Sequence, residues 1–105
     1  MPELIQEYTP RVRGADGVVY LARAMGEQRL DGTWAGWIEF RPIDGVGPVL
    51  PTGQETSQPN RVTLEYWASG LEAIYFEGAL ERARRGRGAA GGMPHAPGED
   101  RREMR

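Results

Sequence analysis

The sequence predicts a small α+β domain, in which an antiparallel sheet of three or four strands carries one C-terminal helix on one face. Three observations predict this class. Several segments place apolar side chains at every second position, an Asp-Gly pair separates two of them, and a run with helical periodicity follows the last. At 105 residues the chain has room for one domain. We assign that domain to residues 1–85 and a flexible tail rich in Gly, Pro and Arg to residues 86–105.

The first two strands are predicted on either side of the Asp-Gly pair at 31–32. The segment "GVVYLARAMGEQ" (17–28) begins with β-branched residues, and "TWAGWIEFRPI" (33–43) alternates along its length. Asp-Gly between two such segments is typical of a β-hairpin with a type I′ turn, in which both central residues take a positive φ. The sequence therefore predicts a hairpin here.

Two of the three tryptophans are predicted to lie on the outer face of the sheet. Trp34 has the parity of the large apolar residues of its strand and is assigned to the core, whereas Trp37 has the opposite parity. The segment "RVTLEYW" (61–67) also alternates, and Trp67 shares the parity of its polar residues. Exposed Trp side chains are typical of interfaces. The alternative is that the N-terminal segment of the chain covers this face.

A helix is predicted over 70–85, "GLEAIYFEGALERARR". Ser69 followed by Glu72 has the spacing of a capping box, and Gly86 is a natural stop. Ile74 falls on the polar side of the helix, so it either packs under a loop or contacts a partner. At about 100° per residue one arc collects the apolar residues Leu71, Ala73, Tyr75, Phe76, Ala79 and Leu80.

The polar segment "LPTGQETSQPNR" (50–61) is the candidate binding loop. Functional side chains are concentrated on loops that a rigid scaffold holds in place. Arg61 either pairs with Glu55, which would make the loop a structural brace, or holds an anionic group of a ligand. With the two outward tryptophans, the candidate binding residues are Trp37, Trp67, Thr52, Glu55, Gln58, Asn60 and Arg61.

The charge of the chain is unevenly distributed. Residues 1–81 contain 6 Arg and 12 acidic residues, whereas residues 82–105 contain 7 Arg and 3 acidic residues. All 13 basic residues are Arg, which favours a bacterial source with a GC-rich genome; selection for anion recognition is the alternative. A nucleic-acid-binding role would use the end of the helix and the tail, although the acidic body disfavours it. Its candidate residues are Arg82, Arg84, Arg85 and Arg87.

Side chains that carry catalysis or hold cofactors are scarce. The chain has no Cys, which excludes disulfides and Cys-based zinc sites, and its one histidine, His95, falls in the predicted tail. We therefore expect no catalytic residue, no metal and no cofactor. The remaining enzymatic hypothesis pairs Glu55 with Arg61 and is the least favoured. No apolar run approaches the roughly 20 residues that span a bilayer, and the N-terminus lacks the features of a signal peptide, so a cytoplasmic location is expected.

The function expected from these patterns is that of a non-enzymatic binding or assembly module. It would contact a protein, a second copy of itself or a small ligand through the aromatic sheet face and the 50–61 loop. Nucleic-acid binding through the Arg-rich end of the helix is the alternative, and no membrane contact is expected.

Overall fold

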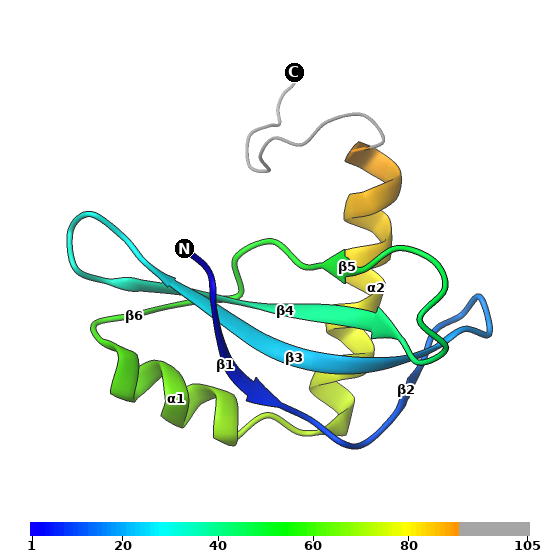
Figure 1. The fold of residues 1–105 in the computed structure, drawn as a ribbon, viewed down its shortest axis with the longest axis horizontal. Helices are drawn as coiled ribbons and strands as arrows, with labels where there is room; N and C mark the ends of the chain where they lie inside the picture. The colour runs from blue at the N-terminus through cyan, green and yellow to red at the C-terminus, as the bar shows by residue number, and fades with distance from the viewer. Residues whose placement is uncertain (91–105) are drawn as a thin grey trace.

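A computed structural model describes residues 1–90 and shows an α+β domain with a six-stranded antiparallel sheet and two helices (Figure 1). This confirms the predicted class but corrects two details, because three or four strands and a single helix were expected. Residues 91–105, the rest of the predicted tail, lie outside this description. The elements are β1 (Glu3–Glu7), β2 (Val12–Arg13), β3 (Val19–Gln28), β4 (Trp34–Pro42), β5 (Leu50–Pro51), β6 (Thr56–Gln58), α1 (Arg61–Ser69) and α2 (Ala73–Ala90).

The hairpin of β3 and β4 forms the centre of the sheet, and Figure 1 shows it crossing the whole molecule. Its register runs from Tyr20 opposite Pro42 to Gln28 opposite Trp34. The short strands β1 and β2 pair with the free edge of β3, and β5 and β6 pair with that of β4. The predicted hairpin is therefore confirmed, and the additional strands are short segments along its two edges.

The turn of this hairpin differs from the predicted type I′. The Arg29 amide donates to the Thr33 carbonyl at 2.7 Å, and the Gly32 amide donates to the Arg29 carbonyl at 3.0 Å. Within this turn only Gly32 has a positive φ, of 92°, so this is a three-residue loop in which a glycine bulge follows an ordinary turn. The Asp31 carboxylate accepts hydrogen bonds from the amide and the hydroxyl of Thr33 at 2.9 and 2.6 Å, which fixes this geometry.

The segment "RVTLEYW" is the helix α1 and not a strand, so that prediction was wrong. Its buried residues are Leu64 and Ala68, which are four positions apart and share one side of a helix. The side chain of Asn60 accepts a hydrogen bond from the Thr63 amide at 2.9 Å and caps the first turn. Seven alternating residues fit a strand and about two turns of helix equally well, and the cap together with burial at Leu64 selects the helix.

The predicted capping box at Ser69 was also wrong. Ser69 is the last residue of α1, and its hydroxyl donates to the carbonyl of Tyr66 at 2.8 Å. The second helix, α2, begins at Ala73 and continues past the predicted stop at Gly86. Ile74 is 79% exposed, so no described loop packs over it.

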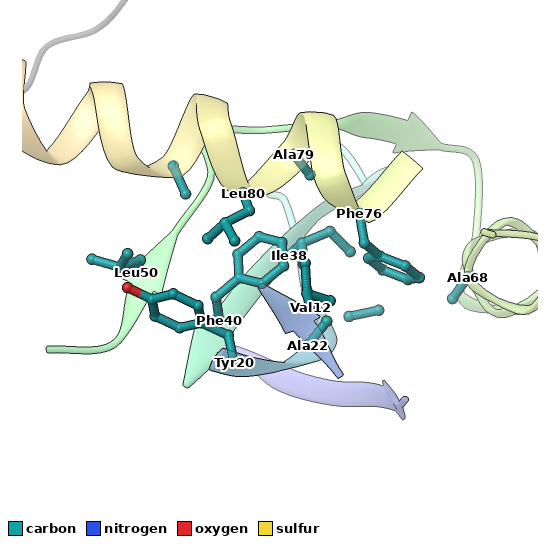
Figure 2. Packing of buried hydrophobic residues seen from close by; sticks show 12 residues of the cluster. Val12, Tyr20, Ala22, Ile38, Phe40, Leu50, Ala68, Phe76, Ala79 and Leu80 are labelled. Carbon is teal, nitrogen blue, oxygen red and sulfur yellow. The ribbon is translucent and has the colours of Figure 1, made fainter. Parts of the chain in front are cut away.

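The hydrophobic core lies between the sheet and α2, as Figure 2 shows. From the predicted apolar arc, Phe76, Ala79 and Leu80 are buried, as expected, and they meet the even-numbered side chains of the central hairpin. Leu71 precedes the helix and is only partly buried. The sheet contributes Tyr20, Ala22, Ile38 and Phe40 to this core.

Helix α1 covers the same face of the sheet as α2. Gly26 and Gly36 lie directly opposite each other in β3 and β4, and Leu64 of α1 occupies the space above both of them. A Cβ atom at Gly26 would lie 2.5 Å from a methyl carbon of Leu64, so the glycines make the close approach of α1 possible. Within residues 1–90, both helices therefore cover one face, and no helix covers the other.

Candidate binding surface

We call the uncovered side of the sheet the open face; it is formed by the odd-numbered residues of β3 and β4 and by their neighbours in the short strands. Met25 lies opposite Trp37 on β4 and opposite Leu4 on β1, and these three make its apolar part. Met25 is buried between its neighbours, whereas Trp37 is half-buried and Leu4 is exposed. The prediction that Trp34 faces the core and Trp37 faces away is confirmed.

Next to the apolar part, a network of ion pairs crosses the open face. Arg23 and Glu39 lie opposite each other, with Arg23 Nη2 2.7 Å from Glu39 Oε1. The same carboxylate oxygen is 3.5 Å from Arg41 Nε, and Arg23 Nη1 is 3.8 Å from Glu7 Oε2. Arg23 Nε is buried and has no hydrogen-bond partner in the described part of the chain. Glu39 thus orients two guanidinium groups on one side of the sheet.

A pocket of about 810 Å³ lies at this end of the open face. The β1–β2 connection, the start of β3 and the end of β4 with the loop that follows it form its walls. Its volume is within the 300–1,000 Å³ typical of small-molecule sites. It combines apolar and charged walls, formed by Glu7, Tyr8, Thr9, Arg11, Leu21, Ala22, Arg23, Arg41, Pro42, Ile43 and Gly45.

The structure separates the two tryptophans that were predicted to share the outer face. Trp67 belongs to α1 and packs against the core on the opposite side of the sheet from Trp37. Its ring meets Tyr75 edge-on, with centroids 6.3 Å apart and an interplanar angle of 89°. The predicted pairing of Trp37 with Trp67 was wrong because the second of them lies on a helix.

In the 50–61 loop, Glu55 and Arg61 do not pair with each other, and each is held by other side chains. Glu55 accepts hydrogen bonds from Arg82 Nε at 3.1 Å, from Arg82 Nη2 at 2.7 Å and from the hydroxyl of Tyr75.

The side chain of Arg61 is directed toward the N-terminal strand and its own helix. It pairs with Glu3 and, at 3.0 Å, with Glu65, and its guanidinium lies 5.5 Å from the ring centroid of Trp34. Glu55 therefore joins the loop to α2, whereas Arg61 joins α1 to β1 and β4.

The other candidate residues of the loop also have partners within the domain. Gln58 donates to the hydroxyl oxygen of Thr56 at 2.7 Å, and Asn60 caps α1. Thr52 is 7% exposed, and its hydroxyl oxygen accepts from the Ile38 amide at 3.1 Å. The loop holds β4 and both helices in place, and a binding role for these residues remains a prediction.

Replacing Thr52 by Val is expected to lower the free energy of unfolding by about 1–2 kcal/mol, because the buried Ile38 amide loses its acceptor. Thr52→Ser keeps the hydroxyl and is the matched control, with a smaller loss. Urea denaturation of the three proteins measures the difference. Equal stability of the Val and Ser variants would contradict the role of this hydrogen bond.

The environment of Glu55 keeps its carboxylate charged. Burial acts to raise the pKa of Glu55, but the hydrogen bonds from Arg82 and Tyr75 outweigh it and hold the pKa below its ordinary value of 4.5. Burial and the neighbouring Glu55 both raise the pKa of the Tyr75 hydroxyl. A general acid at neutral pH needs the opposite shift of its carboxyl pKa, so the geometry offers no support for an enzyme built on Glu55 and Arg61.

The depressed pKa of Glu55 gives the domain a pH-dependent contribution to stability. A carboxyl with a lowered pKa in the folded state stabilises the fold above its unfolded pKa, and that stabilisation is lost as the pH falls through the folded value. We expect Glu55→Gln to cost about 1 kcal/mol at pH 7, since the partner Arg82 is partly exposed. Urea denaturation at pH 7, 5 and 3 should show the cost shrinking with acid, and a constant cost would contradict this role.

Two of the four arginines proposed for nucleic-acid binding are paired with carboxylates inside the domain. Arg82 holds Glu55, as described, and Arg84 lies 3.6 Å from Asp16 and 3.0 Å from Glu81. Arg85 is exposed, and Arg87 belongs to the last turn of α2.

Comparison with known proteins assigns no family to this chain. Comparison with protein-family models, curated proteins and solved structures found no significant match to this chain. No helix within residues 1–90 is long and apolar enough to cross a membrane. In the same part of the chain, no group of three or more His, Asp or Glu side chains is placed to hold a metal ion, and His95 lies outside it.

Proposed function

We propose that this chain is a non-enzymatic binding module that holds a small ligand on the open face of its sheet. The observation that carries the proposal is that both helices lie on one face of the sheet while a pocket of about 810 Å³ opens on the other. A bacterial source and a cytoplasmic location remain parts of this proposal.

The composition of the open face supports this function. An antiparallel sheet with one solvated face normally alternates between apolar residues inward and polar residues outward. Here Leu4 and Trp37 depart from that pattern, because they place apolar surface on the solvated side, and they flank the buried Met25. Beside them, the pocket combines the apolar residues Leu21, Pro42 and Ile43 with charged side chains, and apolar walls with a few convergent charged groups are typical of small-molecule sites.

The pocket favours a small ligand over the other partners considered. A protein partner or a second copy of the chain would use the apolar part around Trp37, whereas the pocket is a concave site bounded by β3, the end of β4 and two loops. The nucleic-acid alternative is weaker, because carboxylates of the domain already pair with Arg82 and Arg84.

Nuclear magnetic resonance screening of the ¹⁵N-labelled chain against mixed anionic, cationic and neutral small molecules tests the proposal. We expect at least one compound to shift the amide signals of Leu21, Arg23, Arg41 and Ile43, which line the pocket, and to leave those of α1 and α2 unchanged. Compounds that shift only the helix signals, or the absence of shifts from every class, would overturn it.

A further inference from the structure

We infer that the pocket on the open face selects a small organic anion, whose phosphate or carboxylate group is held by Arg11, Arg23 and Arg41. This inference rests on the proposed binding function and adds the chemical class of the ligand.

The distribution of arginines is the first support. Residues 1–81 contain only 6 Arg against 12 acidic residues, yet four of the six surround one end of the sheet. Three of them line the pocket, and Arg13 joins Arg11 in lining an adjacent pocket of about 480 Å³, which also shares Ile43 with the first. An acidic domain that gathers its cations at one place creates a local positive field, which attracts anions.

The other two arginines of residues 1–81, Arg29 and Arg61, contact side chains away from the pocket. Arg29 donates to Thr33 and Ser57 at 3.0 Å each and also bonds Gln54. Arg61 is held by two glutamates, as described above. The arginines around the pocket are therefore the main cationic groups available for a ligand in the first 81 residues.

The lining arginines retain free hydrogen-bonding capacity. Within residues 1–90, Arg11 is exposed and makes no ion pair or side-chain hydrogen bond with the domain. The side chain of Arg41 is 50% exposed, and its one ion-pair contact in this part of the chain is the 3.5 Å approach to Glu39. Arg23 also lines the pocket and is oriented by Glu39 at 2.7 Å.

Acidic side chains are fewer than arginines in the lining of the pocket. Glu7 is the one carboxylate in the lining, and it lies 3.8 Å from Arg23 with its side chain mostly exposed. Glu39 pairs with Arg23 and Arg41 beside the pocket, and Asp44 in the following loop accepts from the Val46 amide at 2.8 Å.

Guanidinium groups bind phosphate and carboxylate oxygens in a paired, planar geometry. The side chains of Leu21, Pro42 and Ile43 supply apolar walls beside the charges, so an anion with an organic body fits this site better than an inorganic ion does.

Titration of the labelled chain with phenyl phosphate, benzoate, inorganic phosphate and neutral benzyl alcohol tests the inference. We expect phenyl phosphate, benzoate or both to shift the amide signals of the pocket, inorganic phosphate to bind more weakly and benzyl alcohol not to bind. The stronger of the two aromatic anions identifies the preferred group. Binding of the anions should weaken as salt is added, because exposed charges are screened.

Variants of exposed arginines provide the matched controls. Arg11→Gln and Arg41→Gln should each raise the Kd of the preferred anion about tenfold, which is the effect of losing one charge-assisted hydrogen bond. Arg85→Gln removes the same charge from an exposed position on α2 and should leave the Kd unchanged. Circular dichroism melting curves confirm that all three variants fold.

The outcomes separate this inference from the proposed function. Equal weakening by Arg85→Gln, or benzyl alcohol binding as tightly as the anions, would overturn anion selection. If neutral or cationic compounds alone shift the pocket signals, the binding function stands and the ligand class is wrong. If no compound of any class shifts them, both fail.

Discussion

Replacing Leu64 by Ala is expected to lower the free energy of unfolding by about 2–5 kcal/mol, the range for a large-to-small change in a core. Leu64 is 1% exposed and fills the space above the opposed Gly26 and Gly36. Its loss removes the main contact that seats α1 on the sheet. Val62→Ala on the same helix is the matched control, because Val62 is 71% exposed and its truncation should change stability by about 0.5 kcal/mol or less.

The reverse change at the sheet gives an independent check of the same contact. A Cβ atom at Gly36 would lie 2.6 Å from a methyl carbon of Leu64 and 2.9 Å from one of Thr56, so Gly36→Ala should cost about 1–3 kcal/mol. Combined with Leu64→Ala, the same substitution should cost less, because part of the clash is gone. Strictly additive costs, or a Leu64→Ala loss as small as that of Val62→Ala, would contradict this seating of α1.

The second large effect is expected at Trp67. Trp67→Ser should cost about 2–3 kcal/mol, less than the 3–5 kcal/mol for a fully buried Trp, because the side chain is half-buried against the core and Tyr75. Trp37→Ser should cost about 1 kcal/mol, since Trp37 lies on the open face and packs mainly beside Met25. Urea denaturation of both variants measures this difference.

If Trp37→Ser and Trp67→Ser lowered the free energy of unfolding by similar amounts, the two side chains would lie in similar environments, which contradicts this structure. A Trp37→Ser variant that unfolds would show that Trp37 belongs to the core, and the open face would then not exist as a binding surface. A Trp67→Ser variant as stable as the parent protein would instead show that α1 does not pack on the sheet through that side chain.

The hairpin and the core face of α2 could be predicted because their signals are local. An Asp-Gly pair between two alternating segments marks a hairpin whatever surrounds it, and the parity of Trp34 and Trp37 then follows from the pleat. The segment 61–67 could not be assigned from its alternation. Its alternate residues Val62 and Tyr66 are exposed in the helix, and only Leu64 between them is buried. The signal in the sequence that could have indicated a helix was Asn60, a residue type favoured at the N-cap position.

The arginines of the pocket could not be found from the sequence, because they come from three separate segments. Arg11 lies between β1 and β2, Arg23 within β3, and Arg41 near the end of β4. Only the register brings them together, by placing Arg23 opposite Glu39 and Leu21 opposite Arg41. One signal was present: arginines are few in the first 81 residues, and two of them occupy strand positions with the parity of Trp37.

The most direct test asks whether the open face of the sheet is accessible to solvent, because both proposals depend on that. The chain has no cysteine, so single thiols can be introduced at Ala35 on the open face and at Ala24 on the helix-covered face. In the native protein, Ala35→Cys should react with iodoacetamide much faster than Ala24→Cys, because Ala35 is partly exposed on the open face. Ala24→Cys, at a position with 0% exposure, should react only after denaturant is added. Protection of Ala35→Cys equal to that of Ala24→Cys would show that this face is covered in solution and would contradict a free binding surface there.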